Sequence, residues 1–224
     1  MWNRRKSGEA FPALMHLSAI RAGESGESQV MAVFSDISAM VDYQQELLEL
    51  AYHDQLTKLP NRAQLTTRLE GALGRRRDDH DYLGLVYLDL DDFKAINDTY
   101  GHAGGDRLLV GVAEALSGVL RRSDCVARIG GDEFVCLVDS IRDEKDARAT
   151  LERLARAVEA PVAVGEDGSL CSVTASLGMV ICRRGGVDPD ALLRQADHLM
   201  YEVKRAGGND FVIEAAVGPP HPER

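Results

Sequence analysis

Four consecutive residues, Gly130-Gly131-Asp132-Glu133, combine a chain reversal with two adjacent carboxylates. Apolar residues precede and follow them. A glycine pair between two strand-like runs predicts a tight β-hairpin, because glycine readily adopts the positive φ that such turns require. Successive strand side chains point to opposite faces, so Asp132 and Glu133 cannot both belong to the core. Standing alone, these residues would fit an ordinary solvated turn.

A second group of acids lies upstream of the predicted hairpin. A buried-strand pattern from Leu83 to Leu88 ends in Asp89, and Leu90, Asp91 and Asp92 follow. Mg²⁺ prefers oxygen ligands, takes one or two carboxylates, and leaves other positions for substrate phosphates. A carboxylate at the end of a core strand, near a hairpin that presents two more, therefore predicts a divalent-cation site.

These blocks resemble the GGDEF family, the diguanylate cyclases, which condense two GTP molecules into cyclic di-GMP and two pyrophosphates. The resemblance covers about residues 50–213 and includes three further ordered blocks, which are Asp54–Arg62, Phe93–Asp106 and Ala196–Asn209. It implies an α+β, palm-like nucleotide-cyclase fold. In that fold a central, mainly antiparallel sheet is flanked by helices, and the GGDEF β-hairpin protrudes.

The acids receive their roles from this resemblance. The carboxylates of Asp89, Asp132 and Glu133, with the backbone carbonyl of Leu90, are expected to hold two Mg²⁺ or Mn²⁺ ions per active site. Asp132 and Glu133 are the expected catalytic residues, and Asp132 is either a metal ligand or the group that receives the 3′-hydroxyl proton. Asp91 is a possible further member of the site.

Residues 93–106 are expected to bind the nucleotide. Guanine presents two adjacent donors that suit a carboxylate, and an amide serves mixed donor and acceptor positions. By resemblance, Asn97 and Asp106 therefore read the guanine. His102 either contacts substrate or holds its own loop. The remaining substrate-binding candidates are Phe93, Gly130 and Gly131, with Lys94 and Lys204 as the phosphate cations.

Two positions bear on affinity and regulation. Gly208 stands where the family generally has a phosphate-binding arginine, and Arg205 is a nearby replacement. Arg121 and Asp124 match the R-x-x-D pattern of the family's inhibitory site, so we expect feedback inhibition by cyclic di-GMP there. A basic helix end beside the C-terminal dipole would also account for Arg121.

Composition narrows the functional classes. The chain has 224 residues, 45% hydrophobic and 28% charged, with a net charge of −10. That charge disfavours a nucleic-acid polymer as partner, because proteins that bind one carry basic patches. No apolar run reaches the ~18 residues of a membrane helix. The four cysteines, Cys125, Cys136, Cys171 and Cys182, form no Cys-x-x-Cys pair, which suits a reducing compartment and predicts a cytoplasmic protein.

The pattern divides the chain into four parts. Residues 1–38 predict a β-hairpin that resembles the C-terminal strands of a PAS domain, without a ligand of its own. Residues 39–53 predict a signalling helix capped by Ser38. Its apolar residues follow a 3-4-3 spacing over less than two heptads, which fits either a coiled-coil seam or a single amphipathic helix lying on the domain. The resemblance implies the former, because in the family this position holds the helix that dimerises and transmits signals, and it therefore implies a homodimer. Residues 54–213 form the catalytic domain, and residues 214–224 are expected to be disordered.

Within the catalytic domain the periodicity predicts alternating helices and strands. We expect a helix at 62–76 capped by Asn61, a glycine-rich loop between Asn97 and Asp106, and a helix at about 104–121. The other predicted elements are strand 83–89, hairpin 125–138, helix 143–159, strand 171–181, helix 189–206 and strand 210–213.

The sequence leaves three alternatives to an active cyclase open. A degenerate domain would hold GTP or cyclic di-GMP and regulate a partner. A purine nucleotide cyclase would use one nucleotide for each product. A structural dimerisation domain would require every acid pair to be accidental.

Overall fold

The computed structural model of the chain describes residues 1–22, 27–75, 82–165, 167–183 and 187–216. The chain separates into two compact units, Met1–Ala51 and Tyr52–Arg224. Each unit is described by itself. No helix among the described residues is long and apolar enough to cross a bilayer.

The first unit is an antiparallel sheet followed by a helix. Strands β1 (Trp2–Arg4), β2 (Ala10–Ala22) and β3 (Glu27–Asp36) pair in that order, and α1 (Ser38–Tyr52) follows. The predicted hairpin and helix are therefore both present. The predicted cap is wrong: Ser38 lies inside the helix, and Asp36 accepts hydrogen bonds from the Ser38 backbone N at 2.9 Å and Oγ at 2.7 Å. In the described part of this unit, Ala13 alone is buried.

The second unit is built on a five-stranded sheet of order β10-β9-β4-β6-β5. Pairs β4–β6, β4–β9 and β5–β6 are antiparallel, and β10–β9 is parallel, which confirms the mainly antiparallel sheet. A short antiparallel pair, β7 (Val162–Ala163) and β8 (Leu170–Cys171), lies apart from it. The strands of the main sheet are β4 (Tyr82–Leu90), β5 (Cys125–Gly130), β6 (Glu133–Ile141), β9 (Ala175–Arg183) and β10 (Phe211–Ala215).

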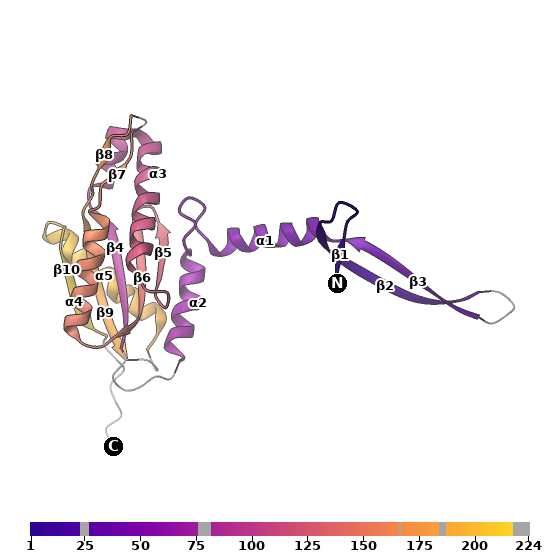
Figure 1. Cartoon of the computed structure of the whole chain (residues 1–224). Coiled ribbons are helices and arrows are strands. Elements are labelled where there is room, and N and C mark those ends of the chain that lie inside the picture. The colour runs from indigo at the N-terminus through magenta and orange to yellow at the C-terminus, as the bar shows by residue number, and fades with distance from the viewer. Residues whose placement is uncertain (23–26, 76–81, 166, 184–186, 217–224) are drawn as a thin grey trace, which may run out of the picture. The chain divides into compact units, whose positions relative to one another are not determined.

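Helices cover both faces of this sheet (Figure 1). Helices α2 (Arg62–Leu73) and α5 (Pro189–Ala206) pack on one face, and α3 (Phe93–Val119) and α4 (Glu144–Val158) pack on the other. Strand β4 serves both cores, because alternate side chains point to opposite faces. Its residues Leu83, Leu85 and Tyr87 face α2 and α5, whereas Val86, Leu88 and Leu90 face α3 and α4.

Several predicted boundaries need correction. The predicted loop between Asn97 and Asp106 is shorter than expected: helical turns already begin at Phe93, the chain leaves helical geometry at Gly101, whose φ is 69°, and the helix then continues to Val119. Strand β9 begins at Ala175, four residues later than predicted. Strand β10 continues to Ala215, so Glu214 and Ala215 are paired with β9 and do not belong to a disordered tail. Residues 217–224 of that predicted tail lie outside the described part.

Candidate active site

The turn that carries the two acids is a two-residue hairpin loop. Gly130 pairs with Glu133 across β5 and β6, which leaves Gly131 and Asp132 at the tip. Gly131 has a φ of 54°, the left-handed conformation that the predicted turn requires of glycine. The guanidinium of Arg128 donates to the Gly131 carbonyl from Nε at 3.0 Å and from Nη2 at 2.7 Å. The loop is therefore held by a side chain of its own strand.

The same guanidinium ties the hairpin to the turn that precedes α2. Nη1 of Arg128 lies 3.0 Å from Oδ1 of Asp54, and both side chains are largely buried. Asp54 also accepts from the backbone N and Oγ of Thr57. Burial opposes its ionisation, but the hydrogen bonds from Thr57 and Arg128 outweigh burial and lower the pKa of Asp54. The sequence analysis assigns no role to Arg128, although it lies only two residues before Gly130.

Asp89 is the buried carboxylate of the site. It is the second-last residue of β4, directly opposite Glu133 of β6 and Ser176 of β9, and its residue exposure is 6%. Lys204, in the last turn of α5, donates from Nζ to Asp89 Oδ1 at 2.5 Å. Burial raises the pKa of Asp89, and the neighbouring carboxylates of Asp132 and Glu133 act in the same direction against Lys204. The predicted phosphate cation and the predicted metal ligand thus contact each other directly.

Glu133 has a hydrogen-bond partner that the sequence analysis missed. Tyr87, two residues before Asp89 on the same face of β4, donates from its hydroxyl to Glu133 Oε2 at 3.0 Å. Burial and the adjacent Glu133 carboxylate raise the pKa of Tyr87 well above its usual range, so the hydroxyl retains its proton. Period-two alternation counted back from Asp89 would have placed Tyr87 on this face.

Both carboxylate oxygens of Asp91 already accept hydrogen bonds within the protein, so Asp91 is not a free ligand. One carboxylate oxygen accepts from Ser176 Oγ at 2.7 Å, and the other accepts from Thr174 Oγ1 at 2.7 Å and from the Asn209 backbone N at 2.9 Å. A Cβ at Gly208, whose φ is 71°, would stand 2.8 Å from the same carboxylate. Asp91 therefore anchors the segment that follows α5 to the start of β9.

The oxygen donors suit a hard cation that also binds substrate. The described residues contain no group of three or more His, Cys, Asp or Glu side chains arranged to hold a metal ion. Asp89 and Glu133 stand in register, and Leu90 adjoins them on β4. Mg²⁺ is commonly held by one or two carboxylates together with substrate phosphates, so the absence of a larger cage is compatible with it. The donor set fits Mg²⁺ or Mn²⁺ when phosphate oxygens complete the shell.

The predicted base-reading residues lie together on α3. Gly105 is buried against the Asn97 side chain, and a Cβ at Gly105 would clash with the Asn97 Oδ1 atom. Asp106 follows Gly105 and is exposed. Within the described ranges, neither the Asn97 amide nor the Asp106 carboxylate has a hydrogen-bond partner in the protein. Phe93 also packs close to Gly105. These polar groups are available to a ligand.

The remaining candidates divide between the site and a distant turn. Lys94 and His102 are exposed on α3. Arg121 is also exposed, but Asp124 is 8% exposed and accepts from the backbone N of Arg121 at 3.0 Å and of Asp139 at 3.1 Å. Asp124 therefore has a structural role in this turn, and its role in an inhibitory site stays a prediction.

Known proteins are similar to this chain in sequence and in fold. The family profile described as "Diguanylate cyclase, GGDEF domain" matches residues 51–210. Diguanylate cyclase TpbB from Pseudomonas aeruginosa is 37% identical over 196 residues, which is 83% of this chain and 45% of TpbB. The bifunctional diguanylate cyclase/cyclic di-GMP phosphodiesterase MucR of the same species is 40% identical over 166 residues, 74% of this chain and 24% of MucR. The chain thus spans less than half the length of these relatives.

Solved structures give the same result. A structure comprising only the GGDEF domain of TpbB from Pseudomonas aeruginosa has a TM-score of 0.67 and 38% identity, covering 72% of this chain and 94% of that one. The coiled coil and GGDEF domain of DgcB from Caulobacter crescentus, solved in complex with c-di-GMP, has a TM-score of 0.69 and 26% identity, covering 80% and 93%. By sequence and by fold, the chain belongs to the GGDEF-domain diguanylate cyclase family.

Proposed function

We propose that this chain is an active diguanylate cyclase, which condenses two GTP into cyclic di-GMP with release of two pyrophosphates. The observation that carries the proposal is the contact of Asp89 with Lys204, opposite Glu133 on the neighbouring strand. A buried carboxylate, a second carboxylate and a lysine within one contact network can neutralise metal ions and a triphosphate together. A degenerate domain would have no need to keep this costly arrangement.

In the proposed reaction the protein forms no covalent bond with the substrate. The 3′-hydroxyl oxygen of one GTP attacks the α-phosphorus of the other, and the bond from that phosphorus to pyrophosphate breaks; the reciprocal step closes the ring. Bound Mg²⁺ or Mn²⁺, two per site, would stabilise the attacking and leaving oxygens. Asp89, Glu133 and the Leu90 carbonyl would hold the metals, Lys204 and Lys94 the phosphates, and Asp132 the proton of the attacking hydroxyl.

The free polar groups on α3 support guanine as the base. Asn97 and Asp106 would read its edge, with Phe93 beside them and His102 nearby, and Gly130 and Gly131 would allow the hairpin to approach the phosphates closely. With metal ions bound at Asp89, the Lys204 ammonium would give up its contact with Asp89 and would contact a phosphate instead. Because Gly208 lacks a side chain, the triphosphate would depend on the lysines and on Arg205.

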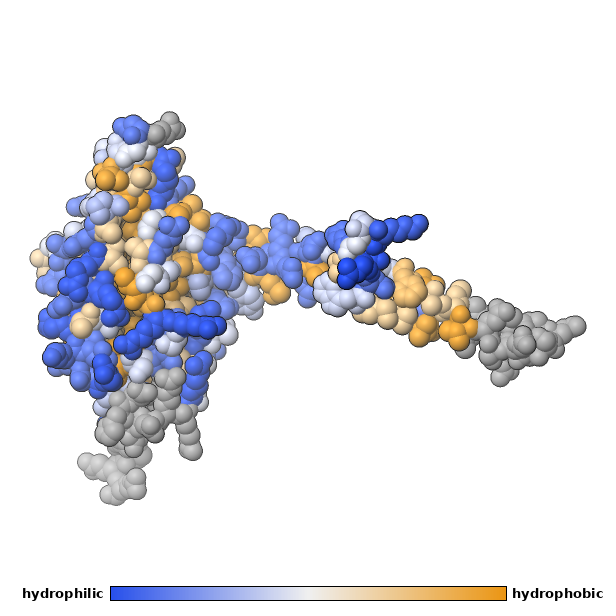
Figure 2. Space-filling view, viewed as in Figure 1, coloured by the Kyte–Doolittle hydropathy of each residue, from blue (hydrophilic) through white to orange (hydrophobic). Residues whose placement is uncertain are grey.

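Two nucleotides must be joined, so the working unit we propose is a homodimer. Helix α1 presents an exposed apolar seam made of Met40, Tyr43, Leu47 and Leu50. Figure 2 shows apolar side chains on the surface of α1 and of the strands of the first unit. Pairing two copies along this seam would bury it and would raise the effective concentration of one catalytic domain for the other.

Further proposals concern the setting of the reaction. Residues 1–38 would be the C-terminal remnant of a PAS domain that aligns the dimer. Cyclic di-GMP would inhibit through Arg121 and Asp124. We place the reaction in the cytoplasm, where GTP is available.

Turnover with a matched inactive variant tests the proposal. Purified protein is incubated with GTP and Mg²⁺ or Mn²⁺ over a range of protein concentrations, beside Glu133→Ala, and the nucleotides are separated by chromatography. We expect cyclic di-GMP from the wild type alone, with a rate per protomer that rises with concentration as dimers form. Nucleotide binding without conversion, even when α1 is replaced by a strong dimeric coiled coil, would instead support the degenerate receptor.

A further inference from the structure

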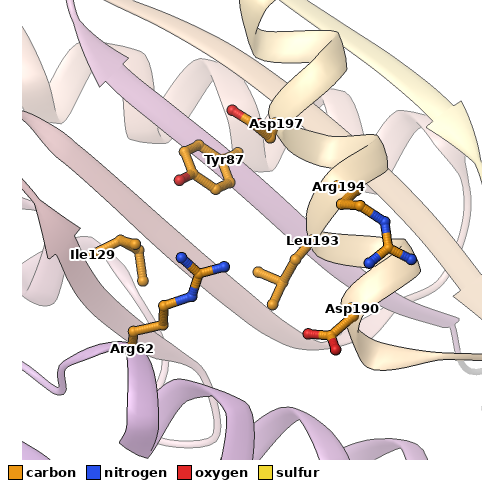
Figure 3. A pocket seen from close by; sticks show the side chains of 7 residues that line it. All are labelled: Arg62, Tyr87, Ile129, Asp190, Leu193, Arg194 and Asp197. Carbon is orange, nitrogen blue, oxygen red and sulfur yellow. The ribbon is translucent and has the colours of Figure 1, made fainter.

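Tyr87 occupies a boundary between the acid cluster and a pocket on the α2–α5 side of the sheet. The pocket has a volume of ≈ 380 Å³. Figure 3 shows Tyr87 among its lining residues, with Arg62 reaching in from α2 and charged side chains from α5 around it. The lining residues are Arg62, Tyr87, Ile129, Asp190, Leu193, Arg194 and Asp197.

The Tyr87 hydroxyl is hydrogen-bonded to Glu133, although other charged groups influence it. The carboxylate of Asp197 and the guanidinium of Arg62 both lie close enough to influence the hydroxyl electrostatically. The hydrogen bond nevertheless runs to Glu133 Oε2 at 3.0 Å, between residues 46 positions apart in the chain. The ring is only 9% exposed, so it has little freedom to move away from this partner.

This bond fixes a side chain that would otherwise be free to rotate. Glu133 directly follows the hairpin loop, and its carboxylate can turn about three torsions. The Tyr87 ring is packed in the core on strand β4, so its hydrogen bond to Oε2 fixes the orientation of the whole carboxylate. The position of the other oxygen, Oε1, is thereby fixed as well. Carboxylates that bind metals are commonly oriented by such outer hydrogen bonds.

We propose that Tyr87 is a positioning residue, which holds the Glu133 carboxylate in the orientation that receives a divalent cation beside Asp89. The inference rests on the proposed function for its metal. It adds a residue that touches neither nucleotide nor metal and acts through Glu133 alone.

Tyr87→Phe removes the donor and keeps the ring. Because Tyr87 lines a pocket, removal of its oxygen creates no new sealed cavity and should cost little stability. The matched control is Tyr82→Phe: Tyr82 lies on the same strand, and its hydroxyl lies 3.4 Å from Arg183 Nη2, at the other end from the acids. Thermal unfolding of both variants checks that they are folded.

The decisive readout is metal affinity and not turnover. Mn²⁺ binding is titrated by electron paramagnetic resonance in the presence of 3′-deoxy-GTP, which lacks the attacking hydroxyl. We expect Tyr87→Phe to bind Mn²⁺ about tenfold more weakly than wild type, since outer-sphere partners typically contribute at least that much. Tyr82→Phe should match wild type. Equal Mn²⁺ affinity in Tyr87→Phe and wild type would overturn the proposal.

A double-mutant cycle separates positioning from a general structural effect. In a Glu133→Gln background, Tyr87→Phe should change Mn²⁺ affinity by less than about twofold, because the carboxylate on which it acts is gone. An undiminished tenfold loss in that background would contradict action through Glu133. The titration needs no cyclic di-GMP synthesis, so a failure of the proposed cyclase activity would be seen separately from a failure of this inference.

Discussion

The acidic residues and the predicted base-reading residues of the candidate site differ in whether they already have partners in the protein. At the acid end, every side chain named here except Asp132 already has a protein partner: Asp89 contacts Lys204, Glu133 contacts Tyr87, and Asp91 accepts three hydrogen bonds. At the base end, Asn97 and Asp106 have no such partner within the described residues.

The difference follows from what each end would bind. Carboxylates crowded at a strand end repel one another, so without metal they need a cation such as Lys204 and fixed donors. The half-buried Asn97 amide and the exposed Asp106 carboxylate can bind water and exchange it for guanine at little cost. Substitutions at the acid end should therefore affect catalysis and in part stability, whereas those at the base end should affect recognition alone.

The largest effect is expected at Asp89. Asp89→Asn keeps the side-chain size but removes a metal ligand and the partner of Lys204, so product formation should fall by at least about 100-fold. Burial raises the pKa of Asp89, so its ionised form opposes folding above its unfolded pKa. Burial opposes the charge of Lys204, but the contact with Asp89 raises the pKa of Lys204 and favours folding. Because these two effects oppose each other, the free energy of unfolding should change by less than about 1 kcal/mol. Initial rates and urea unfolding measure both quantities. Full activity in this variant would remove Asp89 from the catalytic account.

Asp91 tests the structural part of the acid end. Asp91→Ala leaves two hydroxyls and one backbone N–H without their shared acceptor, and should lower the free energy of unfolding by about 3 kcal/mol. Asp98→Ala, an exposed acid on α3, is the matched control and should change it little. Urea denaturation compares them. Equal stability of the two variants would mean that Asp91 is not the anchor described above.

The base end should respond only in recognition. Inosine triphosphate lacks the 2-amino group of guanine, so wild type should prefer GTP over it by about tenfold, and Asp106→Ala should lose most of that preference. The unfolding free energy should stay unchanged. Steady-state KM values for the two nucleotides measure the preference. If Asp106→Ala retains it, another group reads the 2-amino position.

The smallest effect is expected at the Asp54–Arg128 ion pair, which ties the hairpin to the turn before α2. Asp54→Asn weakens the link to Arg128 and should cost about 1 kcal/mol at neutral pH. The pKa of Asp54 is lowered in the folded protein, so this stabilisation is present above its unfolded pKa of about 3.9 and disappears as the pH falls through the folded value. Unfolding free energies of wild type and variant should therefore converge at acidic pH. A constant difference across pH would show that the charge of Asp54 is not responsible.

Much of this architecture could be predicted from local patterns. The run ending at Asp89 and the glycine pair specified β4 and the hairpin, and helix α5 was predicted with its observed bounds. Asn61 was predicted as a cap and accepts from the Gln64 backbone N. Such features depend on neighbouring residues alone. The helical segment from Phe93 to Tyr100 was missed because the glycines at 101, 104 and 105 have low helix propensity and indicated a loop. Gly101 does interrupt the helix, whereas close packing of Gly104 and Gly105 against their neighbours requires small residues there.

The contacts within the site were harder to predict, because they join residues far apart in the chain. Lys204 meets Asp89 across 115 residues, and Tyr87 meets Glu133 across 46. The register of β4 against β6 brings Tyr87 to Glu133, and the packing of α5 on the sheet brings Lys204 to Asp89. Both are properties of the whole sheet. The sequence indicated which residue types would lie together in the site. It did not indicate that Asp91 would accept hydrogen bonds from the start of β9 and from Asn209.

The most direct test of the central claim is the stoichiometry of the product. Wild-type protein is given GTP and Mn²⁺, the nucleotide product is identified by mass, and pyrophosphate is counted. The account predicts a cyclic dinucleotide of two guanosine monophosphates with two pyrophosphates for each product molecule, and none from Glu133→Ala. A monocyclic nucleotide with one pyrophosphate, or the same product from Glu133→Ala, would contradict it.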